Sequence, residues 1–103
     1  MRIVVLVTAK DVSQARRIAQ KLIRDKLAAC VNILPGVESL FWWEGKVDRA
    51  KEVLLLIKTR RSVFKKVTKV VKACHTYSVP EVIALPITAG NPDYLAWIDA
   101  SVR

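Results

Sequence analysis

Two uninterrupted runs of aliphatic side chains constrain the fold of this chain more than any other feature. They cover residues 3–7 and 53–57 and consist only of Ile, Val and Leu. Runs of this kind, without polar alternation, are typical of strands that carry apolar side chains on both faces. Each run is also far shorter than the roughly 20 apolar residues that a membrane-spanning helix needs. We therefore expect two central strands of one sheet and no membrane partner.

The length and the cysteine content indicate one domain in a reducing compartment. The chain has 103 residues, of which 52% are hydrophobic, so we expect a single domain over residues 1–103. Its two cysteines are too few for a disulfide framework. The first residues hold one basic side chain and a short apolar run, without the pattern of a secretory signal. We expect a cytoplasmic protein.

Three segments repeat apolar residues at helical spacing. The first, residues 12–26, follows Asp11, which makes a capping pattern with Gln14 three positions later. The second covers residues 63–74, and its lysines fall on the side opposite to its apolar residues. A short third helix is expected after the Asn-Pro pair at 91–92, which suits a cap and a first helical position.

The remaining segments predict a long hairpin and one further strand. Residues 29–34 form a strand that kinks at the following Pro-Gly pair, and extended structure resumes through the three aromatic residues at 41–43. After a turn at 44–46, a strand over 47–59 would extend about 40 Å at ~3.3 Å per residue. A body of this size has a radius of gyration near ~13 Å, so the aromatic tip should project beyond it. The last strand covers residues 82–87.

These elements predict the fold class. Their order is that of an α+β, ferredoxin-like β-α-β-β-α-β sandwich with an extended hairpin of the second and third strands and a short C-terminal helix. The two long helices would cover one face of the sheet, whereas the two aliphatic runs need cover on both faces. Exposed apolar faces and aromatic edge strands usually mark an interaction surface. We therefore expect the chain to self-associate through strand pairing.

The net charge leaves two interpretations open. A formal charge of +9 could attract nucleic acid, anionic membranes or acidic metabolites. The basic residues are spread along the two long predicted helices, in segments 16–26 and 65–72. Such spacing marks either the solvated outer side of a helix or a site for a polyanion.

A series of short motifs runs through the chain. The motifs are LAACVNI at 27–33 with PGV at 35–37, WEGK at 43–46, Glu52 with Lys58 and Thr59, HTYSVPE at 75–81, LPI at 85–87 with Gly90, and YLAWI at 94–98. Together they resemble the CutA divalent-cation-tolerance family over nearly the whole chain. The chain departs from the family pattern at Thr76, where proline is common, and in its excess of basic over acidic residues.

The resemblance has several implications. It implies a homotrimer joined by its long hairpins, an architecture like that of the PII signalling proteins, a role in divalent-metal and especially copper tolerance, and no established enzymatic activity. Paired hairpins would also make the protein unusually stable to heat.

Cys74 and His75 are the candidate metal ligands. Thiolate and imidazole suit Cu(I), Cu(II) or Zn(II), so copper or another divalent cation is expected here. A closed site needs three or four ligands, which Cys30, Glu81 or groups of another subunit would have to complete. The alternative is a histidine at a helix end beside a packed cysteine. No organic cofactor is indicated.

Residues within the matched motifs predict a ligand-binding cleft. They are Cys30, Glu52, Lys58, Tyr77, Glu81 and Trp97. Glu52 and Lys58 share a face of their strand, so if buried they must be paired. The pair would line an intersubunit cleft that receives an anion or a metal complex, or it would be a structural pair that sets the trimer register. Cys30 could instead be a small buried residue, and Trp97 could pack with Tyr94.

Three classes of function compete. The first is a trimeric, metal-responsive binding or signalling protein. A nucleic-acid-binding module of this fold would stack bases on aromatic residues of the central strands, and the two aliphatic runs contain none. A small-anion or nucleic-acid-binding module of the ferredoxin-like fold is the alternative to the first class. An acylphosphatase-like enzyme would need an anion-binding loop at residues 8–13, which hold no glycine. We therefore expect a metal-binding homotrimer that is not an enzyme and has no nucleic-acid partner.

Overall fold

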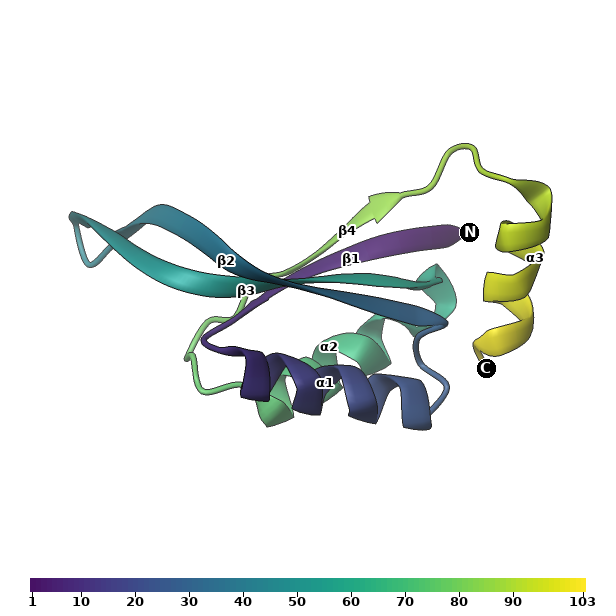
Figure 1. The fold of residues 1–103 in the computed structure, drawn as a ribbon, viewed down its shortest axis with the longest axis horizontal. Coiled ribbons are helices and arrows are strands. Elements are labelled where there is room, and N and C mark those ends of the chain that lie inside the picture. The colour runs from purple at the N-terminus through teal and green to yellow at the C-terminus, as the bar shows by residue number, and fades with distance from the viewer.

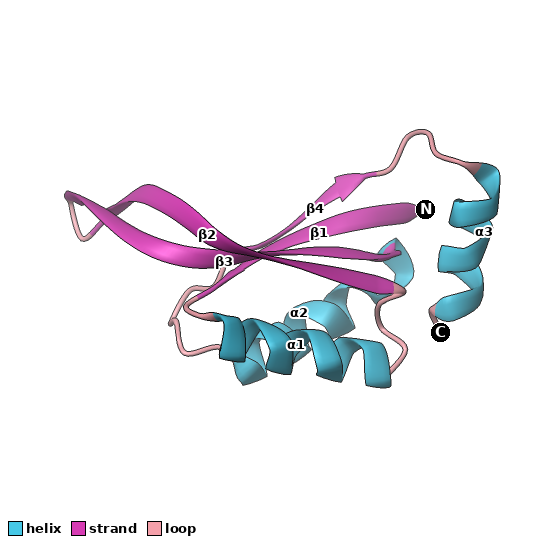
Figure 2. Cartoon of the chain, viewed as in Figure 1, coloured by secondary structure: helices cyan, strands magenta, loops and turns pink.

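The computed structural model describes all residues from Met1 to Arg103, with four strands and three α-helices in the predicted order. The elements are β1 (Arg2–Ala9), α1 (Val12–Arg24), β2 (Cys30–Trp43), β3 (Lys46–Arg60), the 3₁₀ turn η1 (Arg61–Val63), α2 (Phe64–Cys74), β4 (Val82–Pro86) and α3 (Pro92–Ser101), as Figure 2 shows. The predicted α+β, ferredoxin-like class is therefore confirmed. None of the helices combines the length and the apolar character that crossing a membrane requires.

The four strands form one antiparallel sheet in the order β2-β3-β1-β4. β1 and β3, which hold the two aliphatic runs, are the central strands, as predicted. α1 and α2 lie side by side on one face of this sheet, and α3 lies beyond its end, near the N-terminus (Figure 1). The other face of the sheet has no covering layer in a single chain, and we call it the open face.

The core forms between the helices and every second side chain of the central strands. Val5 and Val7 of β1 and Leu55 and Ile57 of β3 have no exposed surface. They pack with buried side chains of the helix layer, which include Ala15, Ile18, Leu22, Val67 and Val71. The residues that alternate with them face the open side and stay half-exposed. The aliphatic runs are therefore apolar on both faces, but the chain covers only one.

Side-chain caps and one backbone reversal set the limits of α1. The Asp11 carboxylate accepts a hydrogen bond from the backbone N–H of Gln14 at 2.7 Å, and the Gln14 amide oxygen accepts one from the N–H of Lys10 at 3.0 Å. The predicted cap is thus confirmed. The helix ends at Arg24 rather than at residue 26, because Lys26 has a left-handed backbone with φ of 56° that takes the chain out of the helix.

The outer halves of β2 and β3, residues 37–52, form an arm that projects past the helices (Figure 1). It closes at a two-residue turn, Glu44 and Gly45, in which both residues have positive φ, as type I′ hairpin turns require. β2 continues through the predicted kink, which is a β-bulge between Leu34 and Val37. The molecule measures 44 × 26 × 23 Å, so the predicted projection of the hairpin is confirmed.

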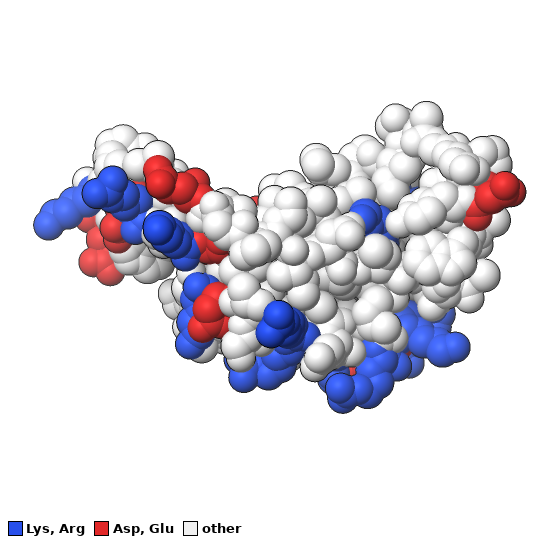
Figure 3. Space-filling model, viewed as in Figure 1, with Lys and Arg blue, Asp and Glu red and all other residues white.

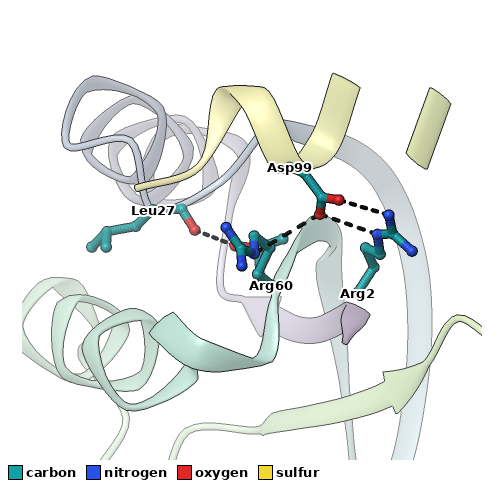
Figure 4. A network of polar contacts seen from close by, with 5 residues as sticks. Arg2, Leu27, Arg60 and Asp99 are labelled. Atoms are coloured by element: carbon teal, nitrogen blue, oxygen red, sulfur yellow. Dashed lines mark hydrogen bonds and ion pairs between the residues drawn. The ribbon is translucent and has the colours of Figure 1, made fainter. Parts of the chain in front are cut away.

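α3 is held at the end of the sheet by an ion-pair network and by buried side chains (Figure 4). The Arg2 guanidinium donates to both carboxylate oxygens of Asp99, at 2.6 and 3.1 Å, and Arg60 Nε lies 3.8 Å from the same carboxylate. The hydrogen bond from Arg2 lowers the pKa of Asp99. Ile98 and Val102 are buried in the core. The network therefore joins the first strand to the last helix.

The buried Thr59 hydroxyl makes a contact that can be tested against a partly buried contact of the same kind. It donates to the Leu27 carbonyl at 2.6 Å, whereas the Thr68 hydroxyl bonds to its own helix, at the Phe64 carbonyl. Thr59→Val keeps the side-chain shape but removes the donor from a buried carbonyl, so the free energy of unfolding should fall by about 1–3 kcal/mol. The matched change Thr68→Val should cost less than about 0.5 kcal/mol. Urea titrations at one fixed protein concentration measure both, and equal losses would contradict the assignment.

Candidate functional site

A pocket of about 760 Å³ lies where the arm joins the body of the sheet. Both strands of the arm, the end of β1 and the loop between α2 and β4 line it: Thr8, Glu38, Ser39, Leu40, Phe41, Trp43, Asp48, Arg49, Ala50, Glu52, Tyr77, Ser78, Val79 and Glu81. Four of the nine carboxylates of the chain are among them, against one cationic side chain, Arg49. The pocket is therefore acidic in a chain whose net charge is +9.

A chain of hydrogen bonds fixes the loop that closes the pocket. His75 Nε2 donates to the Thr8 carbonyl oxygen at 2.6 Å, and His75 Nδ1 accepts from the backbone N–H of Tyr77 at 3.1 Å. These two bonds require the neutral ring with its proton on Nε2. The rings of His75 and Tyr77 lie 4.5 Å apart, and the Tyr77 hydroxyl donates to Glu52 Oε2 at 2.9 Å. His75 thus positions Tyr77, which in turn reaches the buried carboxylate.

Two carboxylates, the buried Glu52 and the more exposed Glu81, dominate the electrostatics of the pocket. Burial raises the pKa of Tyr77 to about 12, with further contributions from the hydrogen bond to Glu52 and from the charge of Glu52. Burial also raises the pKa of Glu81, and the Glu52 charge adds to the effect. Glu52 itself is only 8% exposed. The inner part of the pocket therefore favours positive charge.

Thr76, the position that departs from the family pattern, anchors the same loop to α1. Its hydroxyl oxygen accepts a hydrogen bond from the side-chain amide of Gln14 at 3.2 Å. Gln14 is fully buried, and its amide oxygen caps the start of α1. A proline at position 76 could not provide this hydroxyl, so in this chain the loop is tied to the helix by a side-chain contact.

The predicted metal ligands do not form a closed site within one chain. Cys74 is half-buried against the core at the end of α2, and both ring nitrogens of His75 are engaged in the bonds described above. No group of three or more His, Cys, Asp or Glu side chains comes together to hold a metal ion. A metal at His75 would have to displace the Tyr77 N–H from Nδ1 and take further ligands from outside the chain.

A second group of predicted site residues lies on the open face near α3. Cys30 pairs across the strands with Lys58, whose ammonium lies 4.0 Å from the Cys30 sulfur and donates to the Asn32 side chain. Burial raises the pKa of Tyr94, and its contact with Cys30 adds to this. The Tyr94 and Trp97 rings lie 5.4 Å apart, so the predicted packing of these two residues is observed.

Within one chain, the residues of the predicted cleft lie in two places. Tyr77, Glu52 and Glu81 meet at the base of the arm, whereas Cys30, Lys58 and Trp97 belong to the end of the sheet near α3. The expected pairing of Glu52 with Lys58 does not form within the chain, because six residues of strand separate them by about 20 Å. Their even spacing places them on one face but not within reach.

Sequence reasoning missed the arm residues that line the pocket, above all Glu38 and Asp48. The signal that could have found them is the two-residue turn. Counting outward from the pair Trp43–Lys46 sets Phe41 opposite Asp48 and Glu38 opposite Lys51. The missing step was to treat the hairpin as a paired ladder rather than as two separate strands.

Known proteins resemble this chain over nearly all of its length. The family described as CutA1 divalent ion tolerance protein matches residues 3–101. The chloroplastic protein CutA 1 of rice (Oryza sativa subsp. japonica) is 55% identical over 101 residues, which are 98% of this chain and 57% of the rice protein. The divalent-cation tolerance protein CutA of Thermus thermophilus is 49% identical over 98 residues, which are 95% of each chain. The chain therefore spans little more than half of the rice relative but nearly all of the bacterial one.

Solved structures of similar proteins have the same fold as this chain. The divalent cation tolerance protein of Thermus thermophilus superposes with a TM-score of 0.98 at 47% identity, over 100% of both chains. CutA1 from Oryza sativa superposes with a TM-score of 0.96 at 55% identity, over 99% of this chain and 94% of that one. Because family, sequence and fold agree from the first strand to the last helix, the chain is a member of the CutA1 divalent ion tolerance family.

Proposed function

We propose that the protein works as a cytoplasmic homotrimer that binds a divalent cation, copper foremost, and does not catalyse a reaction. The observation that carries this proposal is the meeting of two carboxylates, Glu52 and Glu81, in the acidic pocket at the base of the arm. Relatives named for divalent-cation tolerance support the class of ligand. The free thiols of Cys30 and Cys74 agree with a reducing compartment.

A cation would relieve the electrostatic conflict in the pocket. Burial and, to a lesser extent, the negative charge of Glu52 oppose ionisation of Glu81. A divalent ion near both would offset the repulsion and the burial. Copper also favours nitrogen ligands, and the His75 ring lies 4.5 Å from the Tyr77 ring, tilted by 51°, beside the pocket. The remaining ligands would come from a neighbouring copy of the chain or would be small ligands that the metal brings with it.

Two features favour binding over catalysis. Both nitrogens of His75, the only histidine in the chain, are held in hydrogen bonds to the backbone, so the ring is not free to move a proton. The Tyr77 hydroxyl, with its pKa raised to about 12, stays protonated near neutral pH and donates to Glu52. These groups therefore serve to position a ligand.

Assembly is supported by two different open edges of the sheet. β4 and the arm part of β2 each have one neighbouring strand only. The arm exposes Leu40 to 68% and Trp42 to 75%, and β4 exposes Ile83 and Leu85 to about half. Because the two edges differ, pairing the arm of one copy with β4 of the next makes a head-to-tail contact that can close into a ring. The family resemblance supports a ring of three.

The first test of this proposal is the assembly itself. Sedimentation equilibrium at micromolar concentration should give three times the 11.6 kDa chain mass. Replacing Trp42 and Trp43 by Asp should shift the protein toward monomer and lower its melting temperature by about 5 °C or more, because the charges would lie in the contact between copies. Ile23→Asp, on the outer side of α1, is the control and should leave the mass unchanged. A stable, folded wild-type monomer would contradict the trimer.

The second test asks whether Glu81 contributes to copper binding. Titration calorimetry with Cu²⁺ should show that Glu81→Gln weakens binding by about tenfold or more. The exposed carboxylate Asp93 on α3 supplies the matched control, since Asp93→Asn should leave the affinity unchanged. If Glu81→Gln binds copper as the parent does, the pocket is not the cation site. His75→Ala, measured in the same way, tests whether the imidazole is a ligand.

In the absence of metal, Glu81→Gln should be more stable than the parent at neutral pH. The folded-state pKa of Glu81 lies above its ordinary value of 4.5, so the ionised side chain costs stability at pH 7. Glu81→Gln removes this cost. The gain should disappear as the pH falls through the raised pKa toward 4.5, because Glu81 of the parent then becomes neutral too. Denaturant titrations at pH 7 and near pH 4.5 measure the difference, and a pH-independent gain would point to another cause.

A further inference from the structure

Nearly all of the net charge of the chain lies on the two helices that cover the sheet. α1 and α2 together hold eight of the 18 lysine and arginine residues and no aspartate or glutamate. The rest of the chain carries ten cationic side chains against nine carboxylates. The helix layer is therefore strongly basic, and the remainder of the molecule is close to neutral.

These cationic side chains lie on the outer sides of the two helices, and we call the surface that they mark the basic face. They are Arg16, Arg17, Lys21 and Arg24 of α1 and Lys65, Lys66, Lys69 and Lys72 of α2, and all are exposed. On each helix three of them follow one another at spacings of four and three residues, on the side opposite to the buried residues. Because α1 and α2 pack together, the two rows belong to one layer, and several groups of blue atoms lie along the lower edge of Figure 3, where that layer is.

The stability of the helices does not explain this arrangement. Lys65 and Lys66 lie in the first turn of α2, where the helix dipole disfavours cations, and that turn contains no acidic residue. Among the eight cations only Lys21 has an ion-pair partner, Asp25 at 2.9 Å. Solvated surfaces of stable proteins usually intersperse both signs of charge. Seven unpaired cations of one sign therefore point to an external partner of opposite charge.

We propose that the basic face binds the phosphate backbone of duplex nucleic acid without reading its sequence. Each row extends about 10 Å at 1.5 Å per residue. A duplex presents about six phosphate charges over that distance, at one per ~1.7 Å. Arginine and lysine are the side chains that make such backbone contacts. This surface is separate from the central strands, whose lack of aromatic residues argues only against base stacking on the sheet.

Two observations favour nucleic acid over a membrane surface and over self-assembly. The only large apolar side chain exposed on α1 or α2 is Ile23, so the basic face has almost nothing to insert among lipid chains. The apolar face of each helix is already used in the core. The arm and the edge of β4 do not belong to the helix layer, so the association proposed above leaves the basic face accessible.

Fluorescence anisotropy with a labelled duplex of about 20 base pairs tests the proposal. The wild-type protein should bind in a saturable way and lose about 100-fold in affinity between about 50 and 200 mM salt, as expected for four phosphate contacts. Lys69→Gln with Lys72→Gln should reduce the salt slope by about two and weaken binding at low salt by about tenfold per lysine. Both changes keep good helix formers, and circular dichroism confirms that the variant is folded.

The matched control removes the same charge from the arm. Lys46→Gln with Lys51→Gln should leave both the affinity and the salt slope close to those of the wild type. An equal effect of the two pairs would overturn the proposal, since net charge alone would then account for binding. So would the absence of saturable binding at 50 mM salt, a more than tenfold preference between two unrelated duplex sequences, or binding to anionic phospholipid vesicles alone.

Discussion

The burial of one alternating set of aliphatic side chains on β1 and β3 is the interaction on which the rest of the structure depends. The register sets Val5 opposite Ile57 and Val7 opposite Leu55, so these side chains enter the helix layer together. The same register directs the other set toward the open face, where a single chain offers no cover. The stability of the subunit and its uncovered apolar face therefore arise from the same two strands, because a strand that is apolar on both faces is fully buried only with a layer on each side.

The acidic pocket depends on this sheet in a second way. β1 ends at Ala9, while β3 continues outward into the arm, so the pocket forms where a central strand stops and its neighbour goes on. The loop after α2 crosses this place, and His75 holds it by a bond to Thr8 near the end of β1. Carboxylates of the arm and of the loop are thus brought together by the difference in strand length. Eight of the cationic residues lie instead on α1 and α2, which contain no carboxylate.

Much of the fold could be predicted from the sequence because its signals are local. Periodicity, the Asp11 cap and the turn at residues 44–46 specify elements through neighbours within a few positions. The candidate site was harder, because its contacts join distant segments: the bond from His75 to Thr8 spans 67 positions. Alternation along a strand correctly placed Glu52 and Lys58 on one face, but it carries no information about distance. The bond between Gln14 and Thr76 could not be foreseen either, since it depends on a loop conformation.

The β-bulge between Leu34 and Val37 determines what kind of sequence change the arm can tolerate. Before the bulge, even-numbered residues of β2 lie opposite even-numbered residues of β3, as Leu34 does opposite Leu54. After the bulge, odd-numbered residues of β2 take these places, as Val37 does opposite Glu52. The extra residue thus inverts the parity of every later position up to the turn. Gly36, with φ of 78°, supplies the backbone geometry. The loss or gain of a single residue in β2 between the bulge and the turn would therefore exchange the two faces of the whole outer half of that strand, whereas a substitution changes one side chain only.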